Sequence, residues 1–249
     1  MSRIRINHQE YDIEGILFDK DGTLLDFGSL WLNWTEQLVE SIAHKTDNIC
    51  QKQTFANSLG FSYKSSTWDP GGPLAIGSMQ DILTILSLNL YQHNIPWNQA
   101  FQTVNEVYSE LESGLDDELS LKPIKGLHTF LEKASEQSVK MGVVTSDNHQ
   151  TAKNHLKILG IDHYFASVIG RDLVKYGKPF PEMVHIALDQ LSLNPEKTLI
   201  IGDSNGDMLL GKYGKTLASI GIGKKNQTHL INADHVIEDY TPEFISMDE

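Results

Sequence analysis

Residues 16–23, Ile-Leu-Phe-Asp-Lys-Asp-Gly-Thr, constrain what this chain can fold into more than any other stretch. A short apolar run ends in two carboxylates, Asp19 and Asp21, and Gly22 follows them directly. This order predicts a buried strand that carries acidic groups at its carboxyl end and then turns sharply. In open α/β sheets, ligands bind in the crevice beyond the carboxyl ends of the strands. The stretch therefore predicts a reactive site at a strand tip.

The two carboxylates suit a particular chemistry. One Asp can attack phosphorus and form an aspartyl phosphate, while a second protonates the leaving oxygen and later takes a proton from water. Carboxylates this close repel each other, and a divalent cation would relieve the repulsion. The alternative is an ordinary turn in which Asp and Gly serve only the backbone. Further reactive groups elsewhere in the chain would decide between the two interpretations.

Composition indicates a globular protein of one large domain or two small ones. The chain has 249 residues, of which 40% are hydrophobic and 21% charged. No apolar run is long enough to span a bilayer, and the first ten residues carry no signal-peptide pattern. The single cysteine, Cys50, cannot form an internal disulfide. We therefore expect a cytoplasmic protein without a membrane partner.

The net charge of −13 argues against nucleic acid and anionic membranes as partners, because both favour a basic surface. A negatively charged protein that handles phosphate must concentrate cations at its site, through metal ions and well-placed lysines. The sequence should therefore contain such a lysine near another strand end.

Residues 28–118 show helical spacing of apolar side chains and no strand pattern. We expect a first helix with Ser29 as its N-cap, a weaker one over 49–59, a third opened by a capping box from Ser78 to Asp81, and a fourth near Pro96. Between the second and third, residues 61–77 form a long stretch rich in turn formers, which we expect to be irregular. The whole segment is predicted to be an all-helical insertion.

Outside the insertion, strands and helices alternate. Strands are predicted over 11–18, 140–145, 167–170, 198–201, 217–222 and 235–237, with helices over 126–135, up to 159 and over 181–191. Such alternation specifies an α/β fold with a parallel sheet covered on both faces. The predicted domains are a core of residues 1–27 and 119–249 and an insertion of residues 28–118.

Three further strand ends carry groups that suit phosphate chemistry. Thr145 offers a hydroxyl near a helix start, where such residues are also common caps. Lys178 lies between Gly177 and Pro179, although a loop lysine can also be merely solvated. Asp203 and Asp207 could hold Mg²⁺, or act as an N-cap and a first-turn acid.

In order along the chain, Asp-x-Asp-Gly-Thr, a strand-terminal Thr, Gly-Lys-Pro and Gly-Asp-Ser-x-x-Asp resemble the four motifs of the haloacid dehalogenase (HAD) superfamily. The resemblance covers roughly residues 11–26 and 122–240. The insertion resembles the superfamily's helical C1 cap, in particular that of the phosphoglycolate phosphatase and β-phosphoglucomutase branch. This implies a Rossmann-like core with an inserted helical cap.

The resemblance also implies roles for single residues. Asp19 would be the nucleophile and Asp21 the general acid and base, and two further sets would bind phosphate and Mg²⁺. The phosphate-binding set is Thr145, Ser146 and Lys178; the Mg²⁺ set is Asp19, Asp21 through its carbonyl, Asp203 and, as an outer ligand or an orienting residue, Asp207.

The implied function is a Mg²⁺-dependent phosphohydrolase that acts on a small phosphorylated metabolite through an aspartyl phosphate, as phosphoglycolate phosphatases do. A β-phosphoglucomutase-like phosphomutase differs only in how well the cap excludes water. Phosphonoacetaldehyde hydrolases use a cap lysine as a Schiff base, for which Lys45, Lys52 and Lys64 are candidates. A binding protein on the same fold is the alternative without catalysis. The oligomeric state is open.

Two other enzyme classes that use a nucleophilic aspartate fit this sequence less well. Halogen-removing relatives need no acid at the position of Asp21. Lys20 makes residues 19–23 resemble the phosphorylation site of P-type ion pumps, yet such pumps need membrane spans.

The insertion is predicted to form a lid hinged near residues 26–28 and 119–123. Within it, the 61–77 stretch, with Lys64 and Trp68, is the candidate for contact with the substrate, or else a tolerated surface loop.

Overall fold

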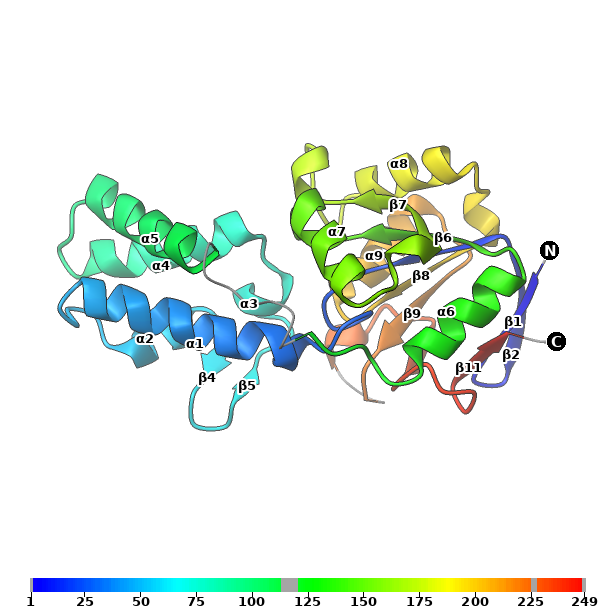
Figure 1. The fold of residues 1–249 in the computed structure, drawn as a ribbon, viewed down its shortest axis with the longest axis horizontal. Helices are drawn as coiled ribbons and strands as arrows, with labels where there is room; N and C mark the ends of the chain where they lie inside the picture. The colour runs from blue at the N-terminus through cyan, green and yellow to red at the C-terminus, as the bar shows by residue number, and fades with distance from the viewer. Residues whose placement is uncertain (1, 113–120, 225–227, 248–249) are drawn as a thin grey trace. The chain divides into compact units, whose positions relative to one another are not determined.

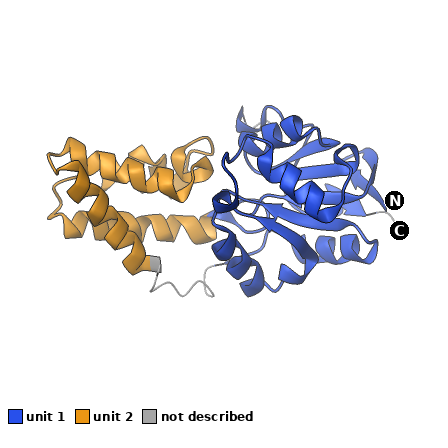
Figure 2. Cartoon of the chain, turned by 90° about the horizontal axis from the view of Figure 1, so that it is seen from above, with its two compact units in different colours: residues 1–27, 121–249 blue, residues 28–120 orange. Residues whose placement is uncertain are grey.

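The structure, a computed structural model, describes residues 2–112, 121–224 and 228–247. The chain forms two compact units, one of residues 1–27 and 121–249 and one of residues 28–120 (Figure 2). The boundaries of the two units lie within two residues of those expected for core and insertion.

A six-stranded parallel sheet organises the first unit (Figure 1). Its order is β10-β9-β8-β3-β6-β7. The strands are β3 (Gly15–Phe18), β6 (Lys140–Val144), β7 (Phe165–Ile169), β8 (Thr198–Gly202), β9 (Ala218–Ile222) and β10 (His235–Ile237). The chain leaves β3 toward β6 and leaves β8 toward β9, so the strand order reverses between β3 and β8. Such a reversal is where open α/β sheets bind their ligands.

Helices cover both faces of this sheet, as the alternation along β3 shows. Ile16 and Phe18 pack into a core with α6 (Leu127–Glu136) and α7 (His149–Ile158). Leu17 points to the opposite face and packs with α8 (Glu182–Leu191) and α9 (Asn205–Gly214). Short 3₁₀ turns complete the unit: η2 (Asp162–Tyr164), η3 (Arg171–Leu173), η4 (Pro195–Lys197) and η5 (Thr228–Leu230). The predicted α/β class is confirmed.

The N-terminus corrects the expected strand over residues 11–18. Residues of that range belong to two strands in two sheets, because β2 (Gln9–Ile13) ends before β3 begins. β2 pairs antiparallel with β1 (Ser2–Ile6), which also pairs with β11 (Ile245–Met247). Ile4 and Ile6 of β1 are fully buried and alternate with less buried arginines, a period of two that indicates a strand with one covered face.

Over its described residues, up to 112, the second unit is helical apart from one small hairpin. Its helices are α1 (Phe27–Lys45), α2 (Lys52–Ser58), α3 (Pro73–Ile76), α4 (Met79–Gln92) and α5 (Trp97–Glu112). Ser29 lies inside α1 and is not its N-cap, whereas the Ser78–Asp81 capping box opens α4 as predicted. The 61–77 stretch is not irregular: it contains the hairpin of β4 (Phe61–Ser62) and β5 (Thr67–Trp68), and then α3.

The two segments that connect the units run side by side within the first unit. Asp26 N donates to the Lys122 carbonyl at 2.7 Å, and Ile124 N donates to the Leu24 carbonyl at 3.0 Å. Of the expected hinge segments, residues 119 and 120 lie outside the described residues. None of the helices within the described ranges has the length and apolar character needed to cross a membrane.

Candidate active site

The register of the central strands sets the position of Asp19. Phe18 at the end of β3 lies opposite Val143 of β6 and Ile201 of β8. Asp19 N donates to the Ile201 carbonyl at 2.8 Å, which continues the ladder by one residue. Since Thr145 and Asp203 each follow the last residue of a neighbouring strand, three polar residues lie at the same edge of the sheet.

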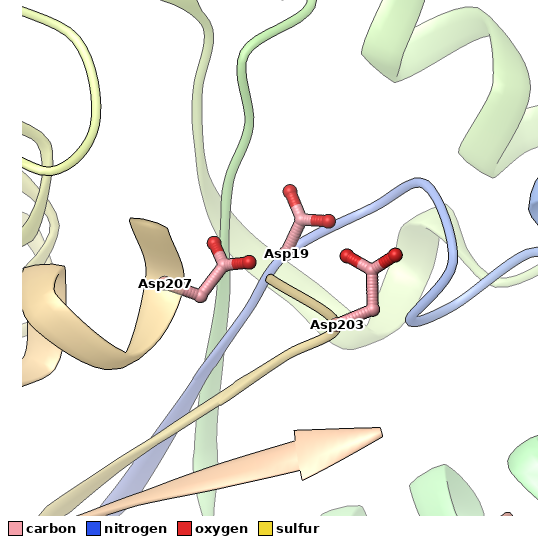
Figure 3. Close-up of side chains that lie close together, drawn as sticks. All are labelled: Asp19, Asp203 and Asp207. Atoms are coloured by element: carbon pink, nitrogen blue, oxygen red, sulfur yellow. The ribbon is translucent and has the colours of Figure 1, made fainter. Parts of the chain in front are cut away.

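Three carboxylates gather at this edge (Figure 3). Asp19, Asp203 and Asp207 each offer an oxygen, and these oxygens all lie within 4.8 Å of one another. Asp19 and Asp207 are almost completely buried. We call these three residues the acid cluster.

Lys178 supplies a positive charge to the acid cluster. Its side chain is buried, and Nζ lies 2.5 Å from Asp19 Oδ1 and 2.7 Å from Asp207 Oδ1. The lysine comes from the connection between β7 and α8. One ammonium thus bridges two of the three carboxylates.

Asp207 has both oxygens engaged. Oδ1 pairs with Lys178, while Oδ2 accepts from Ser204 Oγ at 2.6 Å and from Ser204 N at 3.1 Å. The exchange between Ser204 and Asp207 is a capping box at the start of α9. A Cβ at Gly202 would lie 2.3 Å from the Asp207 Cβ, so this close approach requires glycine. In this structure, Asp207 holds Lys178 and opens α9.

Burial dominates the electrostatics of the acid cluster. It raises the pKa of Asp19 to about 7, against the lowering effect of Lys178, and the negative charges of Asp207 and Asp21 add to the rise. Burial is also the main reason why the pKa of Asp203 lies well above its ordinary value, and the negative charges of Asp19 and Asp207 add to the rise. Burial lowers the pKa of Lys178, but its two carboxylate partners outweigh that effect and raise it overall. Three carboxylates thus share the single ammonium of Lys178, and ionising all of them together is unfavourable without a further cation.

The residues of the acid cluster fit Mg²⁺. Carboxylate oxygens are hard ligands that Mg²⁺ accepts, and the excess negative charge calls for a second cation beside Lys178. Gly22, at φ +76°, comes close enough to Asp203 that a Cβ there would lie 2.0 Å from Oδ2. The turn after β3 is thus shaped around the carboxylate of Asp203.

Asp21 belongs to a second group of charges beside the acid cluster. Its Oδ1 lies 2.7 Å from Nζ of Lys20, whose side chain is fully buried. The same ammonium lies 3.0 Å from His155 Nδ1 and 3.3 Å from Asp147 Oδ2. No role for Lys20, Asp147 or His155 at the site was predicted. The available signal was a lysine placed between two aspartates directly after a buried strand.

Thr145 and Ser146 lie at the end of β6, next to the tip of β3. Thr145 is buried, its N donates to the Ile169 carbonyl at 3.0 Å, and its Oγ1 accepts from Asp147 N at 3.1 Å. Ser146 follows and is half-buried. The structure thus gathers Asp19, Lys178, Asp203 and Asp207 in one cluster. Asp21 interacts electrostatically with Asp19 and Asp203, and Thr145 and Ser146 follow the strand that pairs with β3.

Comparison with known families decides the classification. The family of haloacid dehalogenase-like hydrolases matches residues 16–216, a range that contains all three residues of the acid cluster. The chain belongs to this family. The predicted family is confirmed, and with it the class of phosphoric ester hydrolases.

Relatives of this HAD-family chain include pyrophosphatases. The pyrophosphatase PpaX of Anoxybacillus flavithermus is 27% identical over 236 residues, which are 94% of this chain and 92% of the relative. The PpaX of Bacillus mycoides is 24% identical over 234 residues, with the same coverage of both chains.

Solved structures share the fold. A β-phosphoglucomutase from Clostridium difficile matches with a TM-score of 0.64 at 22% identity and covers 92% of both chains. A HAD phosphatase from Thermococcus onnurineus has a TM-score of 0.64 at 20% identity and covers 92% of this chain and 94% of its own. A protein from Haemophilus somnus, described as a predicted phosphoglycolate phosphatase, has a TM-score of 0.64 at 18% identity and covers 92% of this chain and 95% of its own.

Proposed function

We propose that this HAD-family hydrolase is a Mg²⁺-dependent phosphatase that removes the phosphoryl group of a small phosphorylated metabolite through an aspartyl phosphate on Asp19. One observation carries the proposal. Asp19 is buried at the tip of the central strand, in contact with the Lys178 ammonium and within the acid cluster that fits Mg²⁺.

The residues divide the work as follows. An oxygen of Asp19 attacks phosphorus, and the bond from phosphorus to the leaving oxygen breaks. Asp21 gives its proton to that oxygen, then takes a proton from the water that attacks the aspartyl phosphate, so that phosphate leaves and Asp19 is restored.

Charge stabilisation supports both steps. Lys178 offsets negative charge on the phosphoryl oxygens, with Thr145 and Ser146 as further phosphate-binding residues. Mg²⁺ bound by Asp19, Asp203 and the Asp21 carbonyl, with Asp207 nearby, would supply electrostatic stabilisation of the same charge. Asp207 acts mainly by holding Lys178 in place. The part of the inserted unit in choosing the substrate stays a prediction.

Inorganic pyrophosphate is a second candidate substrate. The PpaX relatives, which align over nearly the full length of both chains and are named pyrophosphatases, favour this substrate. The β-phosphoglucomutase among the solved structures keeps phosphoryl transfer between sugar positions as a third possibility.

The test is a substrate panel with the full chain and Mg²⁺. We expect phosphate release from p-nitrophenyl phosphate, and the metabolite arms are 2-phosphoglycolate, pyrophosphate and glucose 1-phosphate. ³¹P NMR of the glucose 1-phosphate arm separates hydrolysis from transfer, since only hydrolysis yields free phosphate. Absence of phosphate release and of transfer from every substrate would favour a binding protein on the same fold.

A further inference from the structure

Lys20 is the feature of this molecule that the proposed chemistry leaves unexplained. Its side chain has no exposed surface, although a lysine is costly to bury unless its charge is paired and its donors are satisfied. The residue stands between Asp19 and Asp21 in the sequence, directly after the central strand. A side chain needed there only for packing would be apolar.

Three partners surround the Lys20 ammonium, two in hydrogen bonds and the third in an ion pair. They are Asp21 Oδ1 at 2.7 Å, His155 Nδ1 at 3.0 Å and Asp147 Oδ2 at 3.3 Å. An ammonium has three donors and no acceptor capacity, so His155 must offer the unprotonated Nδ1. Two hydrogen bonds, to Asp21 and His155, and an ion pair with Asp147 compensate the buried charge, which explains how the lysine is tolerated in the core.

The partners on the far side of Lys20 are themselves fixed. Asp147 accepts from Asn148 N through Oδ1 at 2.8 Å, and its carbonyl accepts from Arg171 N at 2.8 Å. His155 is buried on α7, near the C-terminal end of that helix. The ammonium is therefore held by side chains that are themselves hydrogen-bonded or buried within the first unit.

We infer that Lys20 is a positioning residue for the proton transfer by Asp21. The inference rests on the proposed function, in which Asp21 protonates the leaving oxygen. By binding Oδ1 at 2.7 Å, Lys20 fixes the orientation of the Asp21 carboxylate. The side chain of Asp21 keeps 17% of its surface exposed while that of Lys20 keeps none, so Lys20 can act on a substrate only through Asp21.

The inference predicts a loss that depends on the leaving group. A p-nitrophenolate leaves with little protonation, whereas the alkoxide of glycerol 2-phosphate needs a proton. The quantity to measure is kcat/KM, because it reports the steps up to cleavage of the ester bond and not the later hydrolysis of the aspartyl phosphate. Each variant is compared at its own pH optimum, which removes shifts of the pH profile.

The experiment compares Lys20→Met, Asp21→Asn and the double variant, with Mg²⁺ and both substrates. Asp21→Asn should lower kcat/KM for glycerol 2-phosphate by about 10²- to 10⁴-fold, and far less for p-nitrophenyl phosphate. Lys20→Met should cost about 10- to 100-fold for the first substrate and under about 3-fold for the second. In the Asp21→Asn background, Lys20→Met should add less than about 2-fold, because both variants remove the same function.

A matched control separates positioning from loss of stability. Leu131→Ala opens a cavity at a fully buried residue of α6 and leaves the charges of the site in place. It should affect both substrates equally. If Lys20→Met does not fold, Asp147→Asn takes its place, with the same selective loss expected at a few-fold size.

The outcomes distinguish the two proposals. If Asp21→Asn lowers kcat/KM equally for both substrates, the proposed role of Asp21 is wrong. If Asp21→Asn is selective but Lys20→Met, or Asp147→Asn in its place, affects both substrates equally or adds in full to Asp21→Asn, the positioning role of Lys20 is overturned and the proposed function stands.

Discussion

Substitution of Gly22 by alanine separates the geometry of the site from the stability of the fold. Gly22 has φ +76°, a conformation that costs a residue with a Cβ about 1–2 kcal/mol. The new Cβ would lie 2.0 Å from Asp203 Oδ2, whereas Cβ atoms in proteins essentially never come closer than 3.0 Å to another heavy atom. The carboxylate of Asp203 must therefore retreat by about 1 Å. A displacement of this size at a reacting centre can lower the rate by about 100-fold.

Gly160 provides the matched control. It also has a positive φ, +69°, but a Cβ there would meet nothing within 4 Å. Gly160→Ala thus carries the same backbone cost of about 1–2 kcal/mol without moving Asp203. We expect the two variants to lose similar free energy of unfolding in urea titrations. Only Gly22→Ala should lose about 100-fold in kcat/KM for p-nitrophenyl phosphate and require more Mg²⁺ for half-maximal activity. Equal activity of the two variants would refute the importance of the Asp203 position.

Three further predictions concern the metal, the core and pH. Chelation should stop phosphate release and Mg²⁺ restore it, while Ca²⁺ should inhibit, because its longer and looser coordination misplaces the nucleophile; full activity in excess chelator would contradict this. Phe18→Ala should lower the free energy of unfolding by about 3–5 kcal/mol, because Phe18 is fully buried with the Phe165 ring 5.8 Å away; a urea titration that shows under about 1 kcal/mol would speak against the assigned core. Burial lowers the pKa of His235, against an opposing effect of Asp234. The neutral imidazole therefore stabilises the fold fully above about pH 6.5, the pKa of histidine in the unfolded chain, and this stabilisation is lost as the pH falls below that value. His235→Gln should therefore lose less stability than the wild type between pH 8 and pH 5 in urea titrations, and an unchanged difference would exclude His235 as the cause.

The central sheet could be predicted because its strands are buried on both faces. β3 and β8 are continuous apolar runs in the sequence, and the carboxylates that follow them mark their ends. The N-terminal hairpin was missed because its signal is an alternation of isoleucines with charged residues, and Tyr11 and Ile13 were joined to the next strand. Its first strand also pairs with residues 245–247 at the other end of the chain, which no local pattern shows.

The site could be predicted where its residues follow strands directly, as Asp19 and Asp203 do, or stand in a recognisable motif, as Lys178 and Asp207 do. Asp19 and Asp203 meet because the register of β3 and β8 brings their ends together. The group around Lys20 depends on His155, a residue 135 positions away on a helix, and such a contact has no trace in local sequence. The engagement of both Asp207 oxygens likewise became visible only with the three-dimensional positions of Ser204 and Lys178.

The most direct test of the account is the turnover of Asp19→Asn. The amide keeps the size of the carboxylate but is a far weaker nucleophile, so we expect kcat for p-nitrophenyl phosphate with Mg²⁺ to fall by at least about 10³-fold. Circular dichroism and urea titration should show the fold intact, and Asp19→Ala guards against regain of activity by deamidation. A kcat within about 10-fold of the wild type in both variants would contradict the assignment of Asp19 as the nucleophile.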